Sequence, residues 1–215
     1  INGGQDMIAH TEELFFTYFK GPRSTRNYDK DFQPDVSLVP NLIASIKKNK
    51  VAVIPNLSYS FTDLLMWDDV DNILTDSEIN YVAPNLVRNE FILGNINRRS
   101  NIENFIHRDQ KKYQLSLALT YKFQKAGILQ LLGTDATQAG LFPGKSAHRE
   151  LTELVKAGLS NYEALSIATK NAGTFAKENN MRESNFGQIR TGFIADMILV
   201  EKNPLKAVSY THLRA

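Results

Sequence analysis

Three short apolar runs, separated by segments with helical spacing, constrain the fold of this chain more than any other feature. The runs are "MIA" at residues 7–9, "VAVI" at 51–54 and "ILQLL" at 128–132, and helical patterns occupy residues 40–49 and 112–125 between them. Buried parallel strands have this continuous apolar character, and crossover helices are needed to connect them. The order therefore predicts an α/β fold with a parallel sheet, either open or closed into a barrel.

Local signals predict where the helices begin and end. Thr11 is a candidate N-cap for a helix after the first run, with two acids in its first turn. Gly127 is a candidate left-handed stop for the helix before the third run. The leucines of that segment, residues 112–125, also alternate as in a strand, but the length of the segment favours a helix. Ser146 is the expected N-cap of a helix that stops at Gly158, and Ser160 has a Glu three residues later, which is the spacing of a capping box.

The composition indicates a soluble globular protein and excludes several other classes. The chain has 215 residues, 42% of them hydrophobic, with 25 basic against 23 acidic side chains and no cysteine. This balance gives no electrostatic reason to expect binding to nucleic acid or to a membrane surface, and "NRRS" at 97–100 is interpreted as a solvated face. Without cysteine, any chemistry on a small-molecule substrate would depend on His, Asp, Glu, Lys or Ser.

Both ends of the chain are unusual. The start, "INGGQDMIAH", has no initiating Met and no signal-peptide pattern, so we expect a fragment of a longer protein whose compartment and oligomeric state the sequence leaves open. No apolar run is long enough to span a membrane. The last residues, 208–215, look like the in-frame translation of a sequencing adapter, so we expect them, His212 included, to take no part in fold or function.

Two regions depart from the alternation of strands and helices. Residues 60–112 are largely polar and carry helix-start signals, so we expect a helical insertion there, because a bare loop of that length is uncommon. Within 185–207, "GQIRTGFIADMIL" has the pattern of two short strands joined by a turn at 190–192. A small all-β element is therefore expected after an α/β part that spans 1–184.

His10 and Asp135 are the candidate functional residues. Each follows an apolar run, and side chains at the carboxyl ends of parallel strands line the active sites of α/β folds. Each also has an ordinary interpretation, Asp135 as the start of an Asx-turn and His10 as a residue at a helix N-terminus. The pattern by itself leaves both interpretations open.

Three motifs occur in order: "LLGTDA" at 131–136, "PGKSAHREL" at the start of 143–172, and "GQIRTGFIADMILVEKNPL" at 187–205. Together they resemble the C-terminal half of amidohydrolase-superfamily enzymes, in the branch close to imidazolonepropionase and the prolidase-like dipeptidases. "MIAHTEEL" at 7–14 resembles the segment that carries the sixth-strand His of this family, and "VAVIPNLSY" at 51–59 resembles its seventh strand.

The resemblance implies the C-terminal part of a (β/α)8 TIM barrel, about strands six to eight, followed by part of a small β-sandwich. It also implies one or two divalent metal ions, usually zinc. His10 matches a metal ligand, and Asp135 matches the carboxylate that contacts the metal centre and takes a proton from the attacking water. Tyr59, with Ser58 beside it, and His148 are candidates to contact substrate, although a packing role is favoured for His148.

The activity implied by the resemblance is hydrolysis of an amide, cyclic amide or related C–N bond by water activated on the metal, whose bound water has a pKa lowered from roughly 16 to about 7. The family's other ligands, on strands one, four and five, have no counterpart in this chain, so we expect the chain alone to be inactive and to bind metal weakly. Two alternatives stay open. One is a phosphotriester or carboxylic ester hydrolase with the same metal centre, and the other is a non-catalytic α/β binding module in which Asp135 is a turn residue.

Overall fold

The computed structural model describes residues 3–19, 32–68, 70–89, 102–136, 138 and 140–211. Its sheet contains strand β1 (Met7–Ala9) and strand β2 (Ala52–Ile54), which pair in parallel with Ile8 opposite Val53. A third segment lies on the other side of β2, where Gln130 forms a parallel bridge to Val53. The predicted parallel α/β arrangement is therefore confirmed, with the three segments side by side in sequence order.

The sheet in the described residues is open and does not close into a barrel. The third segment is held by two backbone hydrogen bonds, from Val53 N–H to the Leu129 carbonyl and from Leu131 N–H to the Val53 carbonyl, each 2.9 Å long. The outer edge of β1 and the outer edge of the third segment have no strand partner among the described residues. These three parallel segments do not form the closed eight-stranded barrel that the resemblance implies.

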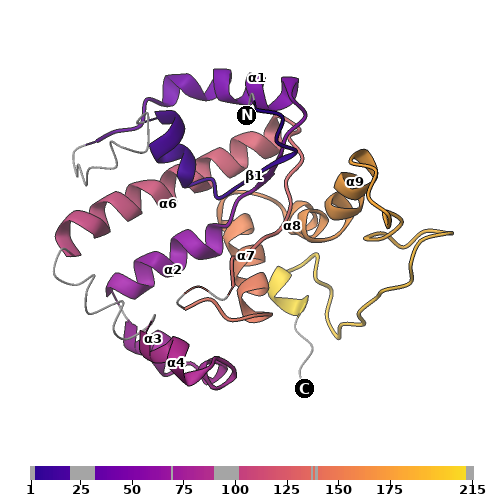
Figure 1. Ribbon diagram of the computed structural model, residues 1–215. Coiled ribbons are helices and arrows are strands. Elements are labelled where there is room, and N and C mark those ends of the chain that lie inside the picture. Colours follow the sequence, from indigo (N-terminus) through magenta and orange to yellow (C-terminus); the bar gives the residue numbers. More distant parts are fainter. Residues whose placement is uncertain are drawn as a thin grey trace.

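Helices α1 (Val39–Lys48) and α6 (Ile102–Lys125) cover the sheet and carry its main core. Val39, Leu42 and Ile46 recur at helical spacing and give α1 one buried face. This face packs with Leu119 and Phe123 of α6 and with aromatic residues of the π-helical turn η1 (Phe15–Phe19). Figure 1 shows α6 crossing the molecule between α1 and α2. Both predicted helical segments are confirmed, and Gly127, with φ of +71°, ends α6 as expected.

The predicted insertion at 60–112 is helical but shorter than expected. Its helices are α2 (Leu57–Asp68), α3 (Val70–Leu74), η4 (Ser77–Tyr81) and α4 (Pro84–Leu86). However, α2 starts directly after β2 and packs on both α6 and α7 (Lys145–Lys156), so it belongs to the main body, as does α6. The insertion is therefore confined to the stretch between α2 and α6, within which residues 90–101, including "NRRS", lie outside the described residues.

The helices after the third segment begin and end largely as predicted. Ser160 and Glu163 form the expected capping box at the start of α8 (Asn161–Ala168), and α9 (Lys170–Glu178) follows it. Gly158, with φ of +100°, ends the stretch that contains α7. The prediction for Ser146 was wrong: Gly144 occupies the N-cap position, and the Ser146 N–H donates to the Phe142 carbonyl from inside the first turn.

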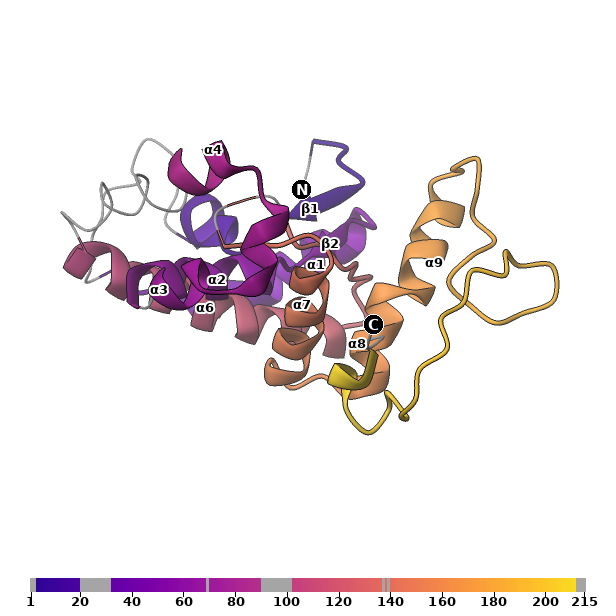
Figure 2. The ribbon, with the colours of Figure 1, turned by 90° about the horizontal axis from the view of Figure 1, so that it is seen from below.

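The segment after α9 does not form the predicted hairpin. Residues 185–207 contain no strand; a turn closes at 190–193, where the Phe193 N–H donates to the Arg190 carbonyl, and the Ile194 N–H donates to the Asn185 carbonyl, but no ladder of hydrogen bonds follows. Ile189 and Leu199 are 92% and 90% exposed. Figure 2 shows this segment looping away from α8 and α9. A strand needs a neighbour to accept its backbone hydrogen bonds, so its apolar pattern alone does not form a sheet.

Residues 208–215 were expected to take no part in the fold, and this was wrong for residues 208–211. The 3-10 helix η6 (Val208–Thr211) packs on α7 and α8, and Val208 is buried in the same apolar cluster as Leu154 and Ile167. An apolar side chain is stabilised by burial whatever the origin of its sequence. His212 lies outside the described residues.

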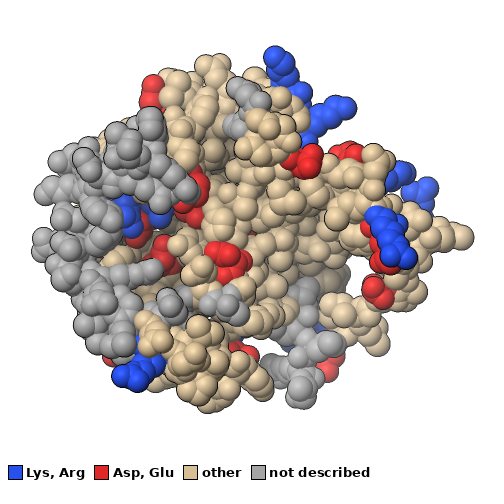
Figure 3. Space-filling view, viewed as in Figure 1, with Lys and Arg blue, Asp and Glu red and all other residues tan. Residues whose placement is uncertain are grey.

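Charged side chains are dispersed over the face seen in Figure 3, where red and blue atoms are scattered among uncharged surface. This agrees with a formal net charge of only +2. Within the part of the chain that the structure describes, no helix combines the length and the apolar character needed to cross a membrane.

Candidate active site

The carboxyl ends of the three strand segments meet at one edge of the sheet. His10, Asn56 and Asp135 follow the three segments, and their φ angles are +65°, +54° and +55°. Left-handed backbone is uncommon for residues other than glycine and costs free energy, and it concentrates at functional sites. All three strand ends adopt it, and this edge of the sheet is therefore the candidate site.

Backbone hydrogen bonds continue between the first two strands beyond their regular pairing. The His10 N–H donates to the Ile54 carbonyl at 3.0 Å, and the Thr11 hydroxyl donates to the Pro55 carbonyl at 2.9 Å. Thr11 is therefore not the N-cap that its sequence context predicts, because its side chain is used to join the two strand ends. These bonds fix the direction in which the His10 side chain leaves the sheet.

The segment that carries Asp135 passes close over the end of β2. A Cβ atom at Gly133 would lie 2.4 Å from Cγ2 of Ile54 and 3.5 Å from Oδ1 of Asn56. Real Cβ contacts are not this short, so a larger residue at position 133 would push the segment away from the sheet. The glycine of "LLGTDA" therefore brings Asp135 near the other two strand ends.

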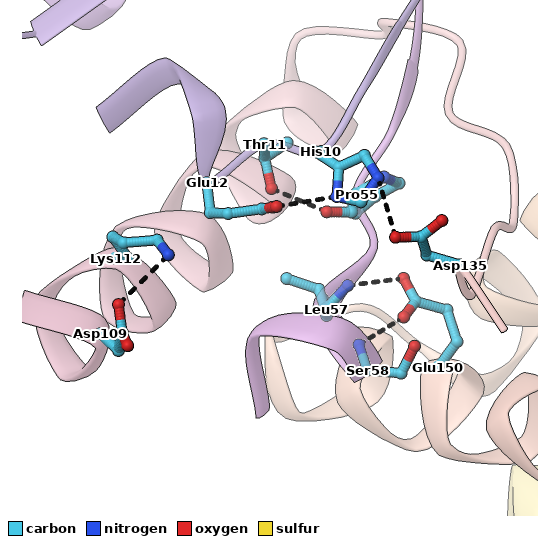
Figure 4. A network of polar contacts seen from close by, with 10 residues as sticks. All are labelled: His10, Thr11, Glu12, Pro55, Leu57, Ser58, Asp109, Lys112, Asp135 and Glu150. Atoms are coloured by element: carbon cyan, nitrogen blue, oxygen red, sulfur yellow. Dashed lines mark hydrogen bonds and ion pairs between the residues drawn. The ribbon is translucent and has the colours of Figure 1, made fainter. Parts of the chain in front are cut away.

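His10 lies between two carboxylates, as Figure 4 shows. Its Nδ1–H donates to Oε1 of Glu12 at 2.8 Å, and its Nε2 lies 3.5 Å from Oδ2 of Asp135. The Glu12 side chain is buried, whereas the side chains of His10 and Asp135 are 25% and 37% exposed. The structure thus brings together the two candidate residues, which are 125 positions apart in the chain, and leaves both accessible.

The two carboxylates change the protonation of the imidazole. The hydrogen bond to Glu12 raises the pKa of His10 above its usual value; burial acts in the opposite direction and is outweighed with the help of the negative charges of Glu12, Asp135 and Glu13. The protonated ring would bridge the two acids. A metal ion at Nε2 would have to replace this proton, because only the neutral imidazole can be a ligand.

The distance between Nε2 and Oδ2 fits a shared metal ion. Two ligands at about 2.1 Å from a tetrahedral ion lie about 3.4 Å apart, close to the 3.5 Å between Nε2 of His10 and Oδ2 of Asp135. Glu12 holds the other ring nitrogen, the usual arrangement behind a metal-bound histidine. The described residues contain no group of three or more His, Asp or Glu side chains able to hold a metal. The fit is therefore good for two ligands, and the remaining ligands would have to come from outside the described part of this chain.

Tyr59 lies next to His10. It stands in the first turn of α2, and its ring meets the imidazole edge to face, with centroids 5.3 Å apart and an angle of 87°. Tyr59 therefore lies beside the candidate site, and its contact with a substrate stays a prediction. Ser58, beside it, is buried, and its backbone N–H is bound by Glu150.

His148 lies in the first turn of α7, as predicted, and is half-buried. Its carbonyl accepts a hydrogen bond from the Thr152 hydroxyl at 3.0 Å. Neither of its suggested roles, packing or substrate contact, is tested by this geometry.

Sequence reasoning missed Glu12 and Asn56 as parts of the site. Glu12 was interpreted as a first-turn acid of a helix, but the chain after His10 makes a turn first, and the carboxylate folds back to the imidazole. The spacing His-x-Glu was a possible signal, although such pairs are common on surfaces. Asn56 follows Pro55 and carried no signal of its buried position.

We expect Glu12→Gln to lower the pKa of His10. Glutamine keeps an acceptor for Nδ1–H but removes the negative charge, so the protonated ring loses its strongest partner. NMR titration of the imidazole signals measures the change, with His107 and His148 as internal references. Glu13→Gln is the matched control and should produce a smaller decrease, because Glu13 contributes least of the groups that raise this pKa. An unchanged His10 titration in Glu12→Gln would contradict the geometry described here.

The chain is similar in fold to a solved structure. No protein-family model matches the chain, and no curated protein matches it. A solved structure described as a Xaa-Pro dipeptidase with bound methionine in the active site is similar, with a TM-score of 0.55 and 17% sequence identity over 96% of this chain. The match covers 36% of that structure, so this chain spans little more than a third of its length. At this identity the likeness concerns the fold alone.

Proposed function

We propose that this chain is the part of a metal-dependent hydrolase of the amidohydrolase superfamily that contributes two residues of its metal centre, His10 and Asp135. The observation that carries the proposal is the convergence of these side chains, 3.5 Å apart, at the carboxyl edge of a parallel sheet. The likeness in fold to a dipeptidase supports a reaction at a C–N bond, either an amide or a cyclic amide.

In this proposal the chain provides one arc of a larger barrel. Residues 1–184 correspond to about strands six to eight with their helices, and residues 185–207 would become strands of a small β-sandwich only beside partner strands from outside this chain. The exposed apolar residues of the second region support this division, because Ile189 and Leu199 have nothing to pack against. The open edges of β1 and of the third segment are where further strands would add.

Each residue of the site has its own role in the proposed reaction. A divalent ion, when bound, supplies positive charge that activates water and polarises the scissile carbonyl. His10 contributes the lone pair of Nε2, while the hydrogen bond from Nδ1–H to Glu12 keeps the ring in that tautomer and orientation. Asp135 accepts a proton from the attacking water on its exposed carboxylate and delivers it to the leaving nitrogen. Tyr59 limits the space on one side of His10.

Metal removal tests the proposal. An intact protein that carries this chain should hydrolyse one of a panel of dipeptides, N-acyl amino acids and cyclic amides, lose that activity on chelation, and regain it with zinc. The 215-residue chain alone, with two ligands, should bind zinc weakly and show no turnover. Hydrolysis of phosphotriesters or carboxylic esters in place of amides would support the alternative substrate class, and activity that survives complete metal removal would overturn the proposal.

A further inference from the structure

A buried carboxylate connects the two helices that follow β2 and the third segment, α2 and α7. Glu150, on α7, is 0% exposed. Its Oε1 accepts a hydrogen bond from the Leu57 N–H at 3.1 Å and its Oε2 accepts one from the Ser58 N–H at 2.6 Å, both in the first turn of α2. Figure 4 shows the side chain extending from α7 to the start of α2.

This contact replaces a local cap. The first N–H groups of a helix have no partner inside the helix, and a residue just before it normally supplies one. Asn56 stands at that position and is of a suitable type, but its backbone is left-handed and its buried Oδ1 has no hydrogen-bond partner. A residue more than 90 positions later in the chain provides the acceptor in its place.

The position of this contact matters because of what comes next in α2. Tyr59 follows Ser58 directly, and its ring lies against His10. On the other side of the contact, Glu150 lies on α7, and α7 begins shortly after Asp135 in the chain. Burial of a carboxylate is costly, and the two hydrogen bonds from the helix N-terminus offset part of that cost, but only while the first turn stays in place.

We propose that Glu150 is a positioning residue of the candidate site: its carboxylate fixes the first turn of α2 and thereby holds Tyr59 against His10. The importance of this for catalysis rests on the proposed function. The positioning itself does not, because it concerns contacts within this chain, and it can be tested without metal or substrate.

The test compares Glu150→Gln with Glu153→Gln. Glutamine at position 150 keeps the shape of the side chain but presents an NH2 group to one of the two backbone donors, so one hydrogen bond is lost. Glu153 is the matched control, because it is also buried on α7 but binds the Tyr113 hydroxyl. Two NMR measurements on the 215-residue chain serve as readouts: amide hydrogen exchange at Leu57 and Ser58, and the chemical shifts of the His10 ring protons, which respond to the nearby Tyr59 ring.

Glu150→Gln should accelerate exchange at Leu57 and Ser58 roughly tenfold or more, as expected for the loss of a buried hydrogen bond. It should also move the His10 signals in the same direction as Tyr59→Leu does. Glu153→Gln should leave both measurements as in the wild type. If Glu150→Gln fails to fold, Glu150→Asp provides the same comparison, since it keeps the charge and withdraws it by one methylene.

Faster exchange with unchanged His10 signals would overturn the proposal, because Glu150 would then be a cap without influence on the site. Exchange at Leu57 and Ser58 that stays as slow in Glu150→Gln and in Glu153→Gln as in the wild type would also overturn the proposal. A protein without metal-dependent hydrolysis, by contrast, would refute the proposed function and leave these measurements valid.

Discussion

Replacing Asp135 by Asn is expected to reduce turnover of an intact protein carrying this chain by about 10²–10⁴-fold, the usual effect of losing a proton-transfer group. Asparagine keeps the size of the side chain and can still occupy the space beside His10, but it neither accepts the proton of the attacking water nor carries the negative charge that attracts a cation. The measurement is kcat on a C–N substrate at saturating metal, so that weaker metal binding does not contribute.

Asp71→Asn is a suitable control for this substitution, because Asp71 is an exposed carboxylate on α3. It should retain wild-type turnover. Full activity of Asp135→Asn would favour the interpretation of Asp135 as a turn residue in a binding module.

The second large effect concerns stability and pH. Burial raises the pKa of Glu150 to about 7 from 4.5; the hydrogen bonds from Ser58 and Leu57 act against this, and the charge of Glu153 adds to it. Since the folded state holds this proton more tightly than the unfolded chain, the stabilisation is complete below about pH 4.5 and is lost as the pH rises to about 7. Linkage over this interval corresponds to roughly 3 kcal/mol in the free energy of unfolding.

Denaturant unfolding of the wild type and of Glu150→Gln between pH 4 and pH 8 measures this effect. Glutamine does not titrate, so the difference between the two curves should fall with pH across the interval. His10, whose raised pKa also makes its contribution decrease with rising pH, is present in both proteins and cancels in the difference, as do the acids with lowered pKa such as Asp109. A difference that is flat with pH would show that Glu150 titrates near its ordinary value.

The parts of this fold that follow from short-range chemistry could be predicted. Ser160 and Glu163 form their capping box because all its partners lie within four residues, and Gly127 ends α6 because glycine adopts a left-handed backbone without strain. The predicted strand at residues 7–9 and the position of His10 after it are also local features. Parallel strands align their carboxyl ends, so the order of the elements placed His10 and Asp135 at one edge of the sheet; only the tertiary structure shows that their side chains lie 3.5 Å apart.

Predictions from local preference failed at Thr11, at Ser146 and in residues 187–200, for different reasons. Ser146 and Thr11 are suitable N-caps by type, but Gly144 begins α7, and the Thr11 hydroxyl binds Pro55 of the next strand. Residues 187–200 have the alternation of a hairpin and no neighbouring strand to pair with. A local capping or strand preference amounts to about 1 kcal/mol, which a long-range contact such as that of Thr11 can exceed.

The sequence alone determines that this chain alternates strands with helices and places an imidazole and a carboxylate at strand ends, since both features depend on spacing along the backbone. Only the tertiary structure decided that Glu12 turns back to hold His10 and that Glu150 caps a helix more than 90 residues away. Those contacts join charged groups whose burial is favourable only once the surrounding elements have packed, and no pattern of neighbouring residues encodes that condition.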